Sequence, residues 1–131
     1  MIQAGYRVYS LDHVQLAMPA GQEDRAREFY RGILGLTEIA KPPRLAKRGG
    51  VWFAGADLQL HLGVEQDFRP AKKAHPALVV EQLDALIERC REAGIEVLPD
   101  EPLEGRRRVF IQDPFGNRIE LIEPLQEPVS G

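Results

Sequence analysis

The chain has 131 residues, of which 44% are hydrophobic and 28% are charged, and these proportions are typical of one soluble globular domain. A net charge of -3 excludes the strongly basic surface that nucleic acids and anionic membranes attract. The single cysteine, Cys90, excludes an internal disulfide. The sequence contains no run of about 18 apolar residues, so it predicts no membrane span. We therefore expect a cytoplasmic protein that binds neither nucleic acid nor membrane.

The first half of the chain predicts a strand, a helix and three further strands. Alternating apolar residues predict the opening strand over residues 7–18. Helical spacing of apolar residues predicts an amphipathic helix over residues 22–34, which Gly35 ends in a left-handed conformation. The same alternation predicts three more strands, with a basic loop before the second of them: residues 36–40, 51–54 and 57–64.

The second half repeats this order after a linker over residues 65–73. Its predicted elements are a strand, a helix and three strands: residues 75–80, 82–93, 95–98, 107–112 and 118–123. We expect one domain over residues 1–131, with modules at about 7–64 and 74–124 and a flexible tail over residues 125–131.

Landmarks in the two halves recur at nearly one spacing, which indicates an internal duplication. His13 matches His75, and the glycine that ends the first helix matches Gly94. The apolar-polar-apolar triplet around Gln59 matches the triplet around Glu120. The sequence therefore predicts an α+β fold of two tandem βαβββ modules that form a curved mixed sheet.

A tight turn at Asp113-Pro114-Phe115-Gly116-Asn117 precedes the last strand. Proline at the second turn position fixes φ, and the following Gly-Asn tolerates left-handed dihedrals, so the chain reverses sharply here. In the strand that follows, Glu120 lies between apolar neighbours. A carboxylate in this position is costly unless it has a partner.

Candidate partners for that carboxylate are the matched histidines. If a pseudo-twofold axis relates the modules, His13, His75 and Glu120 converge inside the curved sheet. Two imidazoles and one carboxylate suit a divalent transition metal. Gln59 either adds a neutral oxygen ligand or orients the ligands by hydrogen bonding. His61, two residues along on the same face, either handles protons near the metal or simply packs.

The chain resembles the vicinal oxygen chelate superfamily, which groups glyoxalase I, extradiol dioxygenases, fosfomycin-resistance thiol transferases and bleomycin-resistance proteins. The resemblance covers about residues 9–124. It is carried by four stretches: Leu11-Asp12-His13-Val14, Phe29-Tyr30 with Leu34-Gly35-Leu36, Lys73-Ala74-His75, and residues 113–121. It implies a homodimer and a cup that holds Fe, Mn, Ni, Zn or Co through the positions of His13, His75 and Glu120.

The resemblance also implies roles for other residues. Glyoxalase I has a glutamate at the position held here by Gln59, and an amide cannot take up a proton in its place. We therefore expect His61 to handle protons and Gln59 to orient it, both as catalytic residues, with Arg108 binding substrate at the rim of the cup.

Three functions follow from this arrangement. The first is a metalloenzyme that activates a small oxygen-bearing substrate by lyase, isomerase or dioxygenase chemistry. The second is a metal-free small-molecule binding protein of the bleomycin-resistance type. The third is a dimeric scaffold with a vestigial site.

Overall fold

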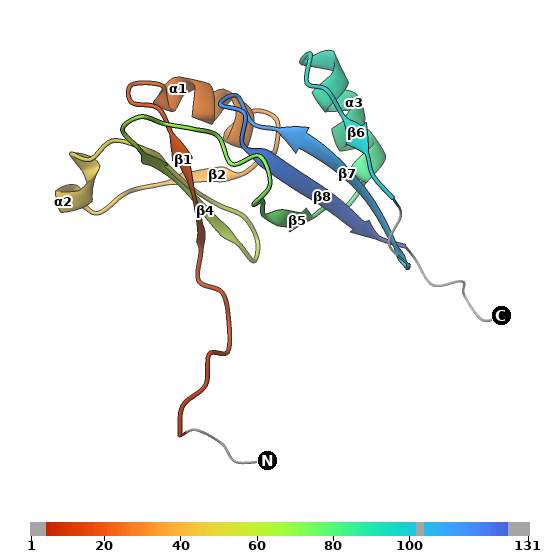
Figure 1. Ribbon diagram of the computed structural model, residues 1–131, viewed down its shortest axis with the longest axis horizontal. Helices are drawn as coiled ribbons and strands as arrows, with labels where there is room; N and C mark the ends of the chain where they lie inside the picture. The colour runs from red at the N-terminus through yellow and green to blue at the C-terminus, as the bar shows by residue number, and fades with distance from the viewer. Residues whose placement is uncertain (1–4, 102–103, 126–131) are drawn as a thin grey trace.

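The computed structural model describes residues 5–101 and 104–125 and shows two four-stranded sheets (Figure 1). The first module has these elements: β1 Val14–Met18, α1 Glu23–Ala26, the π-helical turn η1 Arg27–Arg31, β2 Thr37–Ile39, α2 Pro43–Ala46, β3 Val51–Ala54 and β4 Gln59–Val64. The second module has these: β5 Ala77–Val79, α3 Leu83–Glu92, β6 Leu98–Pro99, β7 Arg106–Gln112 and β8 Arg118–Pro124.

The two sheets have the same topology. Their strand orders are β1-β4-β3-β2 and β5-β8-β7-β6, so each opening strand lies beside the last strand of its own module. That pair is parallel in both sheets, and the other pairs are antiparallel. The predicted α+β architecture of two tandem βαβββ modules is confirmed.

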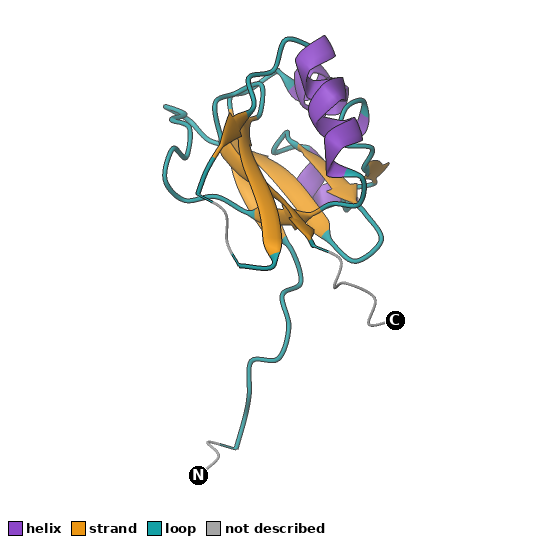
Figure 2. Cartoon of the chain, turned by 90° about the vertical axis from the view of Figure 1, so that its right-hand side faces the viewer, coloured by secondary structure: helices purple, strands orange, loops and turns teal. Residues whose placement is uncertain are grey.

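Helices cover one face of the sheets and enclose the core, and α3 can be followed along its sheet in Figure 2. Alternate strand residues point into this core because side chains of a strand alternate between faces. One cluster joins both modules, and its largest fully buried members include Tyr30, Phe53, Leu62, Ile111 and Leu121. None of the helices in the described residues covers the opposite face of either sheet.

The turn between β7 and β8 connects the two modules. The carboxylate of Asp113 accepts hydrogen bonds from the backbone N–H groups of Phe115 at 2.9 Å and Asn117 at 2.8 Å. It also accepts one from the Tyr30 hydroxyl of η1, at 2.7 Å. The side-chain amide of Asn117 donates to Asp113 and to the Ala17 carbonyl of β1, both at 2.9 Å. A turn predicted from local sequence therefore also fixes how the modules pack.

The opening strand is shorter than predicted. Only Val14–Met18 pairs with β4, whereas residues 7–13 of the predicted strand are extended without a neighbouring strand. A strand needs a hydrogen-bonded partner as well as an alternating pattern, and nothing in the described part of this chain supplies one. The extended segment projects from the body of the molecule (Figure 1).

Other boundaries differ by smaller amounts. The predicted basic loop contains α2, which begins at Pro43, a residue whose fixed φ suits the first helical position. The predicted first helix is an α-helical turn followed by η1, and β5 and β6 are short. Of the predicted tail, Leu125 is exposed and residues 126–131 lie outside the described residues. Within the described ranges, no helix has the length and apolar character to cross a bilayer.

Candidate metal centre

On the uncovered face of the first sheet, three aromatic rings are stacked. The rings of Trp52 and His61 lie 3.9 Å apart and almost parallel, and the His13 ring follows at 4.2 Å from His61. This stack explains why His61 is only 4% exposed although no helix covers it. His61 Nε2 also lies 3.1 Å from Oε1 of Gln59.

The environment of His61 favours its neutral form. Burial lowers the pKa of His61, and the nearby His13 imidazole lowers it further. A neutral imidazole keeps a lone pair that can accept a proton or bind a metal. His13 itself, just before β1, lies beside Asp12, with Nδ1 2.8 Å from Oδ2. Its other nitrogen, Nε2, is then available to a ligand.

On the uncovered face of the second sheet, a histidine and a glutamate form a pair. His75 Nε2 lies 2.9 Å from Oε1 of Glu120, which is 5% exposed. His75 Nδ1 lies 2.8 Å from the Lys73 carbonyl oxygen, to which it can only donate. The carbonyl therefore assigns the hydrogen to Nδ1 and aims Nε2 at Glu120, an orientation common among metal-binding histidines.

Arg108 contacts the same glutamate from the other side. Its guanidinium donates to Oε2 of Glu120 at 3.4 Å and lies 3.6 Å from Asp100. A second donation, from Nε to the Glu101 carbonyl at 3.0 Å, holds the side chain in place. Arg108 thus partners the buried carboxylate. The role predicted for it, contacting substrate at the rim, stays a prediction.

Strand register corrects one part of the predicted duplication. Trp52 lies opposite His61 in the first sheet, and Phe110 lies opposite Glu120 in the second. The parallel pairs agree, because His13 precedes by two residues the β1 partner of His61, and His75 likewise precedes the β5 partner of Glu120. His61, rather than Gln59, is therefore the counterpart of Glu120.

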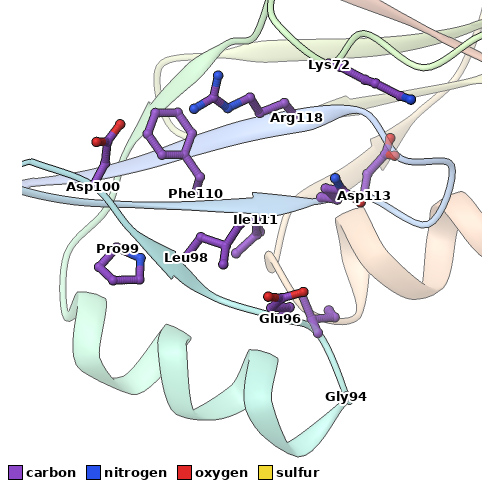
Figure 3. Close-up of a pocket in the computed structure, with 12 residues that line it drawn as sticks. Lys72, Gly94, Glu96, Leu98, Pro99, Asp100, Phe110, Ile111, Asp113 and Arg118 are labelled. Atoms are coloured by element: carbon purple, nitrogen blue, oxygen red, sulfur yellow. The ribbon is translucent and has the colours of Figure 1, made fainter.

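By the same register Gln59 corresponds to Arg118, which the sequence interpretation did not single out. The Arg118 guanidinium lies 3.9 Å from the centre of the Phe110 ring. Both residues line a cavity of about 590 Å³ on the second module (Figure 3). The signal available in the sequence was the alternation of β8, which places Arg118 on the face of Glu120.

The predicted convergence of all three ligand candidates does not occur within one chain. His13 lies with His61, and His75 lies with Glu120. In the described portion of the chain, no three His, Cys, Asp or Glu side chains are grouped so that they could hold a metal ion. The candidate ligands therefore form two separate clusters, one on each sheet, and we call these clusters half-sites.

Two tandem βαβββ modules define a class of small α+β proteins. The chain belongs to the Glyoxalase/Bleomycin resistance protein/Dioxygenase superfamily, whose family model matches residues 10–121. A comparison with curated proteins gives no match.

Solved structures show the same fold. A Bacillus anthracis protein described as belonging to the glyoxalase family has 45% identity and a TM-score of 0.87, over 91% of this chain and 98% of that chain. The antibiotic binding protein TnmS3 from Streptomyces sp. CB03234 has 25% identity and a TM-score of 0.70, over 91% and 99%. The fosfomycin resistance protein FosX from Listeria monocytogenes, solved with Mn(II) and sulfate, has 19% identity and a TM-score of 0.73, over 92% and 94%.

Proposed function

We propose that the protein is a metal-dependent enzyme that binds a divalent transition metal through His13, His75 and Glu120 and acts on a small oxygen-bearing substrate. The observation that carries this proposal is the pair formed by His75 and Glu120. Its nitrogen and oxygen lie 2.9 Å apart. Neighbouring ligands in an octahedral shell, with bonds of about 2.1 Å, lie about 3 Å apart.

The donor set fits Fe, Mn, Ni, Zn or Co. Two imidazoles with one carboxylate leave open positions for substrate oxygens, which is the arrangement of many transition-metal sites. The bound ion would supply Lewis-acid stabilisation of an oxyanion or enolate-like group on the substrate. The Mn(II) in the Listeria protein indicates that the fold can accommodate such an ion.

His61 and Gln59 have separate roles in this proposal. His61 is held neutral by burial and is oriented by its contact with the Gln59 amide. It can therefore accept a proton from a substrate carbon or oxygen and return it. Arg108 contributes a positive charge beside the second oxygen of Glu120. The cavity beside Phe110 is within the size range of small-molecule sites.

The site is completed by a second copy of the chain. Because the half-site with His13 and the half-site with Glu120 are separate within one chain, an ion with three protein ligands needs half-sites from two chains. A twofold dimer would unite each first-module half-site with the second-module half-site of its partner and produce two equal sites.

Elemental analysis of protein purified without chelator tests the proposal. We expect up to one transition-metal ion per chain and a melting temperature that rises with added Mn²⁺, Co²⁺ or Zn²⁺, since an ion that binds the folded state stabilises it. His75→Ala should lose the metal and the stabilisation, whereas Arg107→Gln, on an exposed position that pairs with Asp84, should keep both. Metal-free wild-type protein that no divalent ion stabilises would rule the proposal out.

A second candidate function is metal-free binding of a planar compound. The stack of Trp52, His61 and His13 offers ring faces on an uncovered sheet, and TnmS3 is an antibiotic binding protein. Trp52 is the single tryptophan, so its fluorescence reports on this stack alone. Saturable quenching by a planar cation in chelator-treated protein, retained in His75→Ala, would favour this function over the metalloenzyme.

A further inference from the structure

The segment before β1 exposes an unusual amount of apolar surface. We call residues 5–12 the N-terminal arm. Four of its side chains are largely exposed: Tyr6 by 81%, Val8 by 94%, Tyr9 by 78% and Leu11 by 77%. Single exposed apolar residues are common on protein surfaces, but a run of four large ones marks an interaction site.

Most of the arm has no support from its own chain, and only its last residues, Leu11 and Asp12, border a cavity, which Val79 also lines. It forms no strand or helix, and in both Figure 1 and Figure 2 it runs away from the sheets. The contact found within it is local, since the Arg7 guanidinium lies 5.5 Å from the centre of the Tyr9 ring. An extended segment with unpaired backbone groups is well suited to lie along a second molecule.

Surface that could receive the arm is confined to the other module. Outside the arm, the exposed large apolar side chains among the described residues are Val79, Leu98 and Leu125, and all three lie in or directly after the second module's strands. Val79 is 71% exposed on the edge strand β5. It lies opposite Ile122, on the same face as the pair formed by His75 and Glu120.

The order of residues along the chain links these two surfaces. The arm leads directly into His13, and Val79 lies two residues after Ala77, the partner of Glu120. If the half-sites of two chains meet, the residues just before His13 reach the partner's second sheet beside Glu120. The arm would then continue along the face that carries Val79.

We propose that the N-terminal arm of one chain packs on the second module of another copy, across Val79 of β5, and that two such contacts hold a twofold dimer. This inference rests on the proposed function, because the direction of the arm follows only if the half-sites of two chains meet. It adds the contact that brings those half-sites together.

The exposed surface is sufficient for a stable dimer. A buried aromatic side chain contributes roughly 150–250 Å². Two arms, each with Tyr6 and Tyr9, together with the surface that they cover, reach the roughly 1,200–2,000 Å² of a standard interface. A twofold axis produces two equal contacts, because each chain packs its arm on the other chain.

The experiment measures the oligomeric state of the full chain by sedimentation equilibrium. In the arm variant, Tyr6, Val8, Tyr9 and Leu11 are each replaced by serine, and we expect the dimer dissociation constant to rise by about 100-fold or more. Val79→Lys should raise it by about 10-fold or more, because it places a charge under the arm. Ala85→Lys, on an exposed position of α3, is the matched charge-change control and should leave the constant unchanged.

Mixing the two variants identifies the docking surface. The arm variant keeps a normal Val79, and Val79→Lys keeps a normal arm, so a mixed dimer contains one intact contact. Because each of the two equal contacts accounts for about 10-fold of the roughly 100-fold loss, we expect the mixed dimer to be about 10-fold tighter than the dimer of the arm variant alone. Wild-type affinity in the arm variant, or a mixed dimer no tighter than the arm-variant dimer, would overturn the inference.

Metal content separates this inference from the proposed function. An arm variant that is monomeric and has lost the ion supports both. A monomeric arm variant that still binds one ion per chain supports the arm contact and contradicts the shared site. A dimeric arm variant with its metal supports the shared site and overturns the arm contact.

Discussion

The two modules have the same strand order, yet their uncovered faces differ at equivalent positions. In the first module, His61 lies in a stack of rings, and its closest polar contact is the neutral Gln59. In the second, Glu120 lies between an imidazole and the guanidinium of Arg108. The first half-site therefore consists of aromatic rings around a histidine whose neutral form is favoured. The second consists of a buried carboxylate that lies between an imidazole and a guanidinium.

The turns before the last strands differ in the same way. The turn between β3 and β4 is closed by a backbone hydrogen bond from Gly55 to Leu58, at 2.9 Å. The corresponding turn in the second module is built around the buried carboxylate of Asp113, which also receives Tyr30 from the first module. The two modules therefore share their strand order, but the buried carboxylate that links them belongs to the second module.

The largest expected effect concerns the equivalent positions 61 and 120. Glu120→Gln removes the charged oxygen donor and should weaken metal binding by more than the roughly 100-fold at the upper end of outer-shell losses. His61→Gln leaves the three proposed ligands in place and should weaken it by about 10-fold or less. Competition with a chelating dye measures both affinities. Equal losses would show that the two positions serve as equivalent ligands.

The fold was predictable because its signals are local. Alternation of apolar residues in strands and helical spacing before Gly35 and Gly94 need no knowledge of distant contacts. The turn at Asp113 was predictable for the same reason, since proline and glycine restrict or relax the backbone at their own positions. Residues 7–13 were predicted wrongly as strand because pairing, unlike alternation, depends on a partner.

The register of the duplication was not predictable from the pattern that suggested it. Side chains of a strand repeat every two residues, so a shift of two leaves every residue on its original face. The triplet around Gln59 and the triplet around His61 therefore match the triplet around Glu120 equally well. Only the cross-strand partners, Trp52 and Phe110, decide between them.

The contacts of the Arg108 guanidinium could not be predicted from the spacing of residues in the sequence. Its strand position was compatible with an exposed rim residue, but its guanidinium contacts Glu120 and Asp100. Arg118, which lies on the Phe110 ring, has no carboxylate within ion-pair distance among the described residues.

A second prediction compares the two turns. Asp113→Ala leaves the hydroxyl of Tyr30 and three N–H donors without their acceptor and should lower the free energy of unfolding by about 3 kcal/mol or more. Asp57→Ala, in the exposed turn of the first module, should change it by less than about 0.5 kcal/mol. Urea denaturation of metal-free protein measures both. A loss below about 1 kcal/mol for Asp113→Ala would contradict the central role of this turn.

The smallest effect concerns the hydrogen bond between the modules and its dependence on pH. Burial raises the pKa of Tyr30 well above its ordinary value, and the charge of Asp113 raises it further. The unfolded chain releases this proton near pH 10, whereas the folded chain keeps it. The folded state then holds the extra proton, so stability is fully present below about pH 10 and falls as the pH rises above it, by up to about 1.4 kcal/mol per pH unit.

Tyr30→Phe isolates this contribution. At neutral pH the variant should be less stable by about 1–2 kcal/mol, because Asp113 loses one donor and keeps the other three. Above about pH 10 the difference from wild type should shrink, since phenylalanine has no proton to lose. Cys90, whose pKa is also raised by burial, is present in both proteins and cancels in the comparison. Urea midpoints measured between neutral and alkaline pH supply the test, and a difference that stayed constant would show that Tyr30 ionises equally in the folded and unfolded chains.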